Sequence, residues 1–247
     1  MQKFLKKATL LAALVAAGAA NATTIAFEQS KFGDGSSVDS LLVEGDLFAD
    51  SGFLFGPFSN AAGAQPGDLV GAMVDGSQLA ATCFAVSCPT NNSSHFYTAL
   101  NDGVLYMAAQ NGAAFSVQGF SAAFLGASGE TLPSVAGLLR LQGVKADGSG
   151  SINYTVQLAG PASGSLSFAD FSTSGAFATT LFSEVYFYGF TCNSAGSCSA
   201  FSTDRGQFAL DNINVTAVPE PSQWMLMALG LGGVGAVLRR RRGEQAA

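Results

Sequence analysis

The stretch LLRLQGVKADGSGSINYTVQL, residues 138–158, decides the fold class of this chain. Its second half, Ser151–Leu158, alternates strictly between apolar and polar residues. A period of two is typical of a strand with one buried side and one solvent-facing side. Leu138–Lys145 precedes this strand, and Asp147-Gly148-Ser149-Gly150 supplies turn residues between the two segments. The stretch therefore predicts an antiparallel strand pair. Its buried face would carry Ile152, Tyr154, Val156 and Leu158, and its wet face Ser151, Asn153, Thr155 and Gln157.

The composition of the whole chain favours strands and turns over helices. Its 247 residues include 30 Gly and 20 Phe, and Phe suits strands while Gly suits the turns between them. Turn signals recur about every 8–12 residues, as in sandwiches and barrels. One such signal, Asn101-Asp102-Gly103, predicts a hairpin of Phe96–Leu100 with Val104–Ala109. We predict an all-β fold, an antiparallel β-sandwich of the jelly-roll type, over residues 23–217.

An aromatic run lies early in this domain. Phe53, Phe55 and Phe58 surround Gly56-Pro57, and a proline inside such a run indicates an edge strand or a structured loop. The rings could be buried under a loop or could form a stacking platform for a ligand. Phe lacks the polar group that favours Tyr and Trp at wet sugar-binding faces, so burial is the favoured interpretation.

The last strand, Gly206–Thr216, contains a break in its pattern. Phe208 and Leu210 share one face, whereas Ile213 and Val215 lie on the other. A β-bulge near Asp211-Asn212 would restore a single apolar face. We expect this strand to lie beside the first one.

Pairing of the first and last strands would bring two carboxylates together. Glu28 belongs to the predicted first strand, Thr23–Gln29, and Asp211 to the last. Oxygen ligands of this kind suit a hard cation, so the pair predicts a structural calcium ion. Turn and capping hydrogen bonds are the alternative role for both residues.

The four cysteines fall into two close pairs, Cys83-x4-Cys88 and Cys192-x5-Cys198. In an exported chain such pairs predict disulfides. Three connectivities are open, and the two local loops are favoured. Neither spacing is Cys-x2-Cys, which argues against a zinc site.

Charge and the residue inventory exclude several function classes. Residues 23–217 hold four basic against fifteen acidic residues, a net charge of −11, which is unsuited to nucleic acid. A histidine-dependent hydrolase would have to use His95, the sole histidine, and no Gly-x-Ser-x-Gly elbow occurs. Many acids lie in turns such as Asp34-Gly35 and Asp75-Gly76. We predict no catalytic residues and no required cofactor; a glycosidase-like carboxylate pair is the alternative.

The N-terminus predicts export. Lys3, Lys6 and Lys7 precede the apolar segment Leu10–Ala17, and Ala20-Asn21-Ala22 fits the small-x-small rule for cleavage. Residues 1–22 are therefore predicted to be a signal peptide that is cleaved after Ala22.

The C-terminus predicts a membrane segment. Residues 222–238 are apolar and would span roughly 25 Å as a helix. The cluster Arg239, Arg240, Arg241 and Arg242 follows, and by the positive-inside preference it would remain cytoplasmic together with the tail, residues 243–247.

Pro219-Glu220-Pro221, the apolar segment and the arginine cluster together resemble the tripartite PEP-CTERM sorting signal over residues 218–242. Gln207-Phe208-x-x-Asp211 resembles a pattern that precedes the signal in a subgroup of these proteins. The resemblance implies recognition by an exosortase, a membrane-embedded cysteine protease of Gram-negative bacteria that make exopolysaccharide. It also implies transient anchoring in the inner membrane, then a cell-surface or extracellular location.

Two function hypotheses follow. The favoured one is a non-enzymatic surface or matrix protein that associates with exopolysaccharide or biofilm. The alternative is a carbohydrate-binding module or, as a further option, a hydrolase that acts on the same polysaccharide.

Overall fold

The computed structural model describes residues 21–38, 41–83 and 85–217, which contain the compact unit Ala22–Thr216. The predicted sorting signal, the cytoplasmic tail and most of the signal peptide, including Ala20, lie outside the described residues. Ala22 falls inside the first strand, Asn21–Ile25, so cleavage after Ala22 would leave Thr23–Ile25 of that strand in the mature protein.

The described residues form seventeen strands and three short helices. The strands are β1 (Asn21–Ile25), β2 (Lys31–Phe32), β3 (Leu41–Val43), β4 (Phe48–Asp50), β5 (Phe53–Ser59), β6 (Leu69–Asp75), β7 (Val86–Ser87), β8 (His95–Ala99), β9 (Gly103–Ala109), β10 (Phe115–Phe124), β11 (Gly126–Ala127), β12 (Val135–Lys145), β13 (Ser151–Ala159), β14 (Ala169–Ser172), β15 (Phe182–Cys192), β16 (Cys198–Ser199) and β17 (Phe208–Ala217). The helices are η1 (Gly76–Gln78), α2 (Leu79–Thr82) and α3 (Gly175–Thr179).

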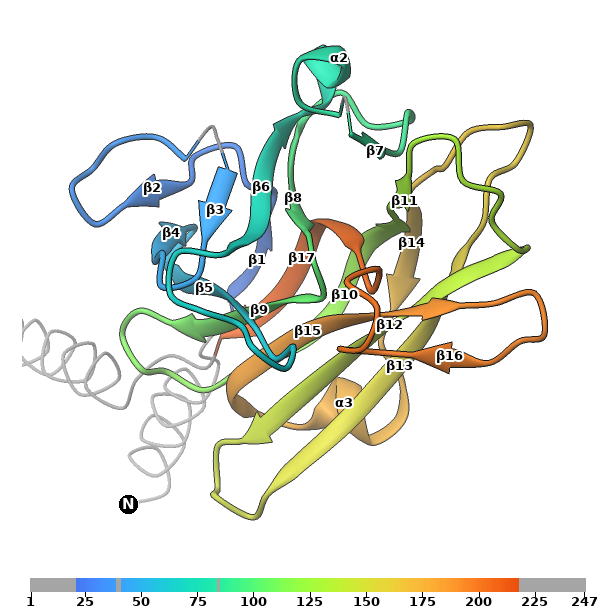
Figure 1. Cartoon of the computed structure of the whole chain (residues 1–247). Coiled ribbons are helices and arrows are strands. Elements are labelled where there is room, and N and C mark those ends of the chain that lie inside the picture. Colours follow the sequence, from blue (N-terminus) through green and yellow to red (C-terminus); the bar gives the residue numbers. More distant parts are fainter. Residues whose placement is uncertain (1–20, 39–40, 84, 218–247) are drawn as a thin grey trace, which may run out of the picture. The chain divides into compact units, whose positions relative to one another are not determined.

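Fifteen strands form one curled sheet that folds into two layers, and β7 pairs separately with β11. One layer has the order β3-β6-β8-β17-β10-β14, with β1 also on β17. The other has the order β2-β4-β5-β9-β15-β12-β13, with β16 also on β15. The layers are joined where Phe115 of β10 opposes Phe182 of β15. Figure 1 shows β12, β13 and β15 side by side, with β6 and β8 in the other layer. The predicted all-β, antiparallel sandwich is confirmed.

The core between the layers is built from aromatic rings. Phe27, Phe48, Phe55 and Tyr97 are almost fully buried, and the Phe27 and Phe48 ring centroids lie 5.4 and 5.2 Å from that of Phe55. Burying one such side chain contributes about 1.5–3 kcal/mol to the free energy of unfolding. The phenylalanines that are frequent in the sequence thus fill the interior between the two layers.

The predicted pair at residues 138–158 forms as β12 and β13, whose register runs from Leu138 opposite Gln157 to Val144 opposite Ser151. Val156 and Leu158 are buried, whereas the polar residues of the alternation are exposed. The outer sides of these strands become one wall of the candidate site.

Two sequence expectations are wrong in their pairing. The strands on either side of residues 101–103 form, but β8 pairs with β6 and β17, whereas β9 pairs with β5 and β15. The turn is therefore a corner between layers and not a hairpin.

The strand that contains Pro57 is not at an edge, since β5 lies between β4 and β9. The ladder with β4 covers only Phe53–Phe55, so Pro57 lies where β4 has ended and no N–H is required.

The predicted irregularity in the last strand lies at Asn212, which has a φ of +49°. Leu210, Ile213 and Val215 are all buried, so the extra residue returns the alternation to one apolar face. The strand also lies beside β1, as expected.

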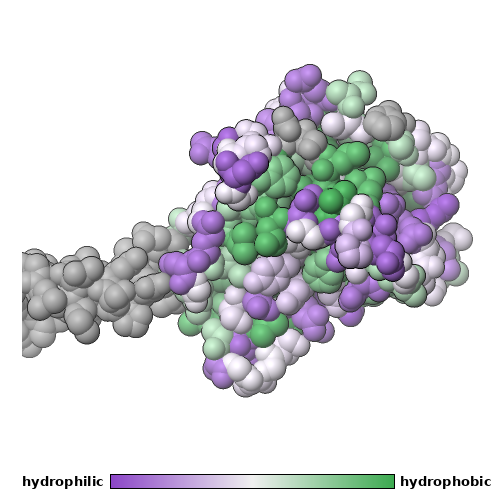
Figure 2. All heavy atoms as spheres, turned by 60° about the vertical axis from the view of Figure 1, so that its left-hand side comes forward, coloured by the Kyte–Doolittle hydropathy of each residue, from purple (hydrophilic) through white to green (hydrophobic). Residues whose placement is uncertain are grey.

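An apolar hollow of about 180 Å³ lies at the end of one layer, between β3, β6 and α2, and Leu41, Met73, Val74 and Val86 contribute to its lining. Figure 2 shows apolar side chains gathered on this side of the domain. None of the helices in the described residues has the length and apolar character needed to cross a membrane; the predicted segment 222–238 lies outside them.

Candidate functional site

Five strands of the second layer place one residue each in a straight row on its outer face. In order these are Gly56 on β5, Tyr106 on β9, Tyr186 on β15, Gln142 on β12 and Asn153 on β13, each opposite the next. Directly opposed residues of an antiparallel pair point to the same face. With strands about 4.8 Å apart, this tyrosine row spans roughly 19 Å.

The two tyrosines at the centre of the row contact each other and a carboxylate. Their ring centroids lie 5.5 Å apart, and the Tyr186 hydroxyl donates a 2.8 Å hydrogen bond to Oε2 of Glu184. Burial, together with this hydrogen bond and the Glu184 charge, raises the pKa of Tyr186 to about 12. Burial and the same charge also raise the pKa of Tyr106. Both phenols therefore stay neutral at physiological pH.

A second row runs beside the first, displaced by two residues on each strand. It consists of Phe58, Val104, Tyr188, Arg140 and Thr155, again opposed in sequence. Nε of Arg140 donates to Oγ1 of Thr155 at 3.0 Å, and its guanidinium lies 4.8 Å from the centroid of the Phe190 ring, a cation–π geometry. We call this second row the arginine row. The two contacts hold the Arg140 side chain in place.

The loop between β16 and β17 bounds the arginine row. Phe201 packs against Tyr188, with ring centroids 5.4 Å apart. Asp102, which is 1% exposed, holds the base of this loop by accepting backbone N–H bonds from Thr203, Asp204 and Gly206. Three donors satisfy the buried carboxylate, so the corner after β8 positions the loop.

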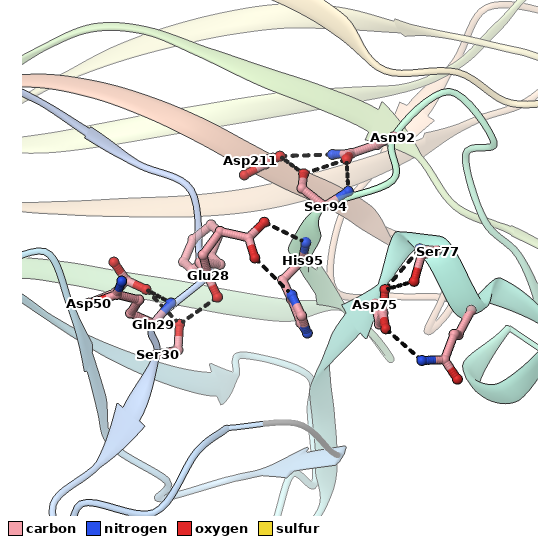
Figure 3. Close-up of polar contacts among 12 residues, drawn as sticks. Glu28, Gln29, Ser30, Asp50, Asp75, Ser77, Asn92, Ser94, His95 and Asp211 are labelled. Atoms are coloured by element: carbon pink, nitrogen blue, oxygen red, sulfur yellow. Dashed lines mark hydrogen bonds and ion pairs between the residues drawn. The ribbon is translucent and has the colours of Figure 1, made fainter.

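A second polar cluster contains the residues expected to bind calcium (Figure 3). Asp211 is fully buried; its Oδ2 accepts from Nδ2 of Asn92 at 2.8 Å and from Oγ of Ser94 at 3.2 Å. Burial raises the pKa of Asp211 while these hydrogen bonds lower it, and the Glu28 charge adds to the increase. Asp211 thus ties the loop before β8 to the last strand.

Glu28 is close to this cluster but is not in a strand, which corrects the sequence expectation. β1 ends at Ile25, and Phe27 has a φ of +56°, so the chain turns before Glu28. The Glu28 carboxylate accepts the backbone N–H of His95 and contacts Nδ1 of its ring, both at 3.0 Å. His95 is the first residue of β8, and its side chain is 38% exposed.

Hydrogen-bond donors surround Asp211, so an ion would have to displace the amide of Asn92 to reach its oxygens. Within the part of the chain that the structure describes, no group of three or more His, Cys, Asp or Glu side chains is arranged to hold a metal. The structural calcium ion stays a prediction.

Both local disulfides are present. Cys83 bonds Cys88, and Cys192 bonds Cys198. The first lies beside α2, and the second closes the turn between β15 and β16. Loops this short stabilise by roughly 2 kcal/mol each in the chain-entropy picture.

Three exposed acids have the turn role that the sequence indicates. Oδ1 of Asp34 accepts from Ser36, that of Asp75 from Ser77 and that of Asp147 from Ser149. These hydrogen bonds lower the pKa of each carboxyl. Such acids are turn formers with low proton affinity, and a general acid needs the opposite shift.

The tyrosine row was not predicted from the sequence. The stacking platform considered there consists of Phe53, Phe55 and Phe58, and the first two of these are buried, in agreement with the favoured interpretation. The sequence feature that could have indicated the row is the alternation of Tyr186 and Tyr188 in β15. Their partner Tyr106 lies 80 positions away and shares no local pattern with them.

Comparisons with solved structures give distant likenesses. A DUF4465 family protein from Bacteroides caccae has a TM-score of 0.46 at 12% identity, over 80% of this chain and 100% of that one. A xylan-binding CBM22-2 domain from Paenibacillus barcinonensis has a TM-score of 0.33 at 13% identity, over 79% and 99%. CBM22-1–GH10 modules of a Clostridium thermocellum xylanase, complexed with xylohexaose, score 0.37 at 9% identity, over 80% and 28%.

Sequence comparison is more specific at the C-terminus. Among curated proteins, none matches this chain. Residues 217–242, however, match the family described as PEP-CTERM protein-sorting motif, in agreement with the resemblance carried by Pro219-Glu220-Pro221 and the arginine cluster. The chain therefore carries a PEP-CTERM protein-sorting motif, the signal of an exported protein that is sorted by an exosortase.

Proposed function

We propose that this protein is a non-enzymatic, polysaccharide-binding protein of the cell surface or extracellular matrix, and that it binds through the tyrosine row. The observation that carries the proposal is the pairing of Tyr106 and Tyr186 beside Gln142 and Asn153 on one solvent-facing side of the sheet.

The two halves of the row suit the two kinds of surface on a sugar. A pyranose ring has an apolar C–H face, which stacks on an aromatic ring, and hydroxyl groups around its edge. Tyr106 and Tyr186 offer rings with a polar end, and the amides of Gln142 and Asn153 each donate and accept. Gly56, at the β5 end, is buried against Leu47, so the open part of the row crosses four strands from Tyr106 to Asn153. At about 4.8 Å per strand this part spans roughly 14 Å, enough for a glycan chain of a few sugar units to lie along it.

Polar groups elsewhere support a binding role over a catalytic one. The Asp102 and Asp211 carboxylates are buried and accept several hydrogen bonds each. Asp34, Asp75 and Asp147 form turns. Glu184 accepts from Tyr186 within the proposed binding face itself.

The sorting motif supports the location. On this proposal an exosortase recognises Pro219-Glu220-Pro221 while the segment 222–238 holds the chain in the inner membrane. Cleavage then releases the domain to the cell surface or its surroundings, where exopolysaccharide is the available ligand. On this proposal the motif directs the protein to the cell surface, and the tyrosine row keeps it there by binding polysaccharide.

A glycan array probed with the full-length chain in detergent micelles tests this proposal. We expect saturable binding to at least one polysaccharide, weakened at least tenfold, about 1.4 kcal/mol, in Tyr186→Ala. Gln142→Ala, at a half-exposed position, should also weaken it. The matched control is Phe171→Ala, because Phe171 is a half-buried aromatic on β14 in the other layer. Binding to no glycan, or equal binding by all variants, would refute the proposal.

A further inference from the structure

We infer that the polysaccharide bound along the tyrosine row is uncharged, so that hydroxyl groups and ring faces are recognised without ion pairs. The inference rests on the proposed function and names the class of ligand. The inference follows from three observations: the charge of the whole domain, the positions of its basic residues, and the groups in the row itself.

The domain as a whole repels polyanions. Its net charge of −11 comes from fifteen acids against Lys31, Arg140, Lys145 and Arg205. A field of this sign lowers the local concentration of an anionic polymer and slows its association. An acidic polysaccharide would need a local cluster of cations to overcome this repulsion.

The four basic side chains do not form such a cluster at the row. Arg205 forms an ion pair with Glu130, and Nζ of Lys31 donates to Ser37 next to β2. Lys145 is at the end of β12, close enough to Asp147 to lower the pKa of that acid. Arg140 lies in the neighbouring row, bonded to Thr155 and stacked on Phe190.

The row itself presents neutral groups, with Glu184 two residues away on one side and Arg140, held by Thr155 and Phe190, two residues away on the other. Tyr106, Tyr186, Gln142 and Asn153 carry no formal charge. Glu184 is held beside the tyrosine pair by the hydrogen bond from Tyr186, where it would meet any carboxylate or sulfate on a sugar stacked over these rings. Like charges brought this close repel each other, and such repulsion is a source of specificity.

A cationic, amino-sugar polymer is the competing class, because Glu184 and the acidic domain would attract it. Two observations favour the uncharged class. Glu184 already accepts the Tyr186 hydroxyl, and the β13 positions opposite the β12 face, Ser151, Asn153 and Thr155, are neutral hydroxyl and amide groups.

Affinity measurements at two salt concentrations test the inference. The full-length chain is titrated with uncharged glucans, xylans, mannans and galactans, with alginate as the polyanion and with chitosan as the polycation. We expect the tightest binding to an uncharged polymer, with a Kd that changes less than about twofold on a tenfold increase in salt. Alginate should bind at least tenfold more weakly, and Glu184→Gln should narrow that gap.

The outcomes separate the inference from the proposed function. Tightest binding to alginate or chitosan that falls steeply with salt and is lost in Tyr186→Ala overturns the inference and leaves the binding function intact. Binding to none of these polymers overturns both. Tightest, salt-insensitive binding to an uncharged polymer that Tyr186→Ala weakens at least tenfold supports both.

Discussion

Tyr106 and Tyr186 oppose each other across β9 and β15, with their ring centroids 5.5 Å apart and Glu184 beside them. The pair is 80 positions apart in the sequence and is brought together only by the sheet. It forms the centre of a face whose aromatic half comes from β9 and β15 and whose polar half comes from β12 and β13.

The ionisation of Tyr186 should report its environment. Its pKa of about 12 lies above the ordinary value of 10, so its contribution to stability is fully present below pH 10 and is lost as the pH rises through 12. In an ultraviolet titration of phenolate formation, Tyr186→Phe should lack a transition near pH 12. A Tyr186→Phe variant that keeps the transition near pH 12 would contradict this pKa for Tyr186.

The hydrogen bond from Asn92 to Asp211 should stabilise the fold in a pH-dependent way. Asn92→Ala removes a donor from a buried carboxylate and should lower the free energy of unfolding by about 1–3 kcal/mol at neutral pH. The substitution raises the pKa of Asp211 further, and a raised pKa disfavours the folded state only where the carboxyl is ionised. The loss should therefore shrink as the pH falls through the raised pKa of Asp211, and it should be smallest near the ordinary carboxyl value of 3.8, measured by urea unfolding.

Asn91→Ala is the matched control for this experiment. Asn91 makes two hydrogen bonds, both to the backbone of Phe168, where no charge is involved. Its destabilisation should not depend on pH through this range. Equal pH dependence in both variants would contradict the role given to Asp211.

The predicted calcium ion can be tested by thermal unfolding. An ion held by Glu28 and Asp211 would stabilise the fold by about 2.7 kcal/mol at a calcium concentration of 100 times Kd. The Tm should then rise with calcium in the wild-type chain and stay constant in Glu28→Gln. A wild-type Tm that calcium does not change would show that no calcium ion binds at this cluster.

The sorting motif predicts a change in mass. In cells that contain an exosortase, the wild-type chain should lose the segment after Pro219-Glu220-Pro221 and leave the inner-membrane fraction. A chain with all three residues changed to alanine should keep both its mass and its location. Glu244→Ala, outside the matched residues 217–242, is the control and should behave as wild type. Equal masses for wild type and the triple variant would reduce the segment to an ordinary anchor.

Features set by nearby residues could be predicted from the sequence. The β12–β13 pair follows from strict alternation and an intervening turn, and the disulfides follow from spacings of five and six residues. The irregularity at Asn212, where φ is +49°, follows from a change of apolar face within one strand. In each case the deciding interaction lies within about twenty residues.

Features set by partners far along the chain could not be predicted. Residues 101–103 resemble a hairpin turn, but Asp102 bonds backbone groups of residues 203–206, which makes the turn a corner between layers. Pro57 is tolerated inside a sheet because β4 is short. The tyrosine row needs the register of five strands at once, which no local pattern specifies.

The most direct test of polysaccharide binding at the tyrosine row is fluorine NMR of the chain with all five tyrosines replaced by 3-fluorotyrosine. Each resonance is assigned by a Tyr→Phe variant, and an uncharged polysaccharide that binds is added. Binding along the row predicts saturable shifts for Tyr106 and Tyr186. It predicts none for Tyr97, which is buried in the core, or for Tyr154, whose hydroxyl bonds the carbonyl of Ser172. Saturable binding that leaves the resonances of Tyr106 and Tyr186 unchanged would contradict the proposed site.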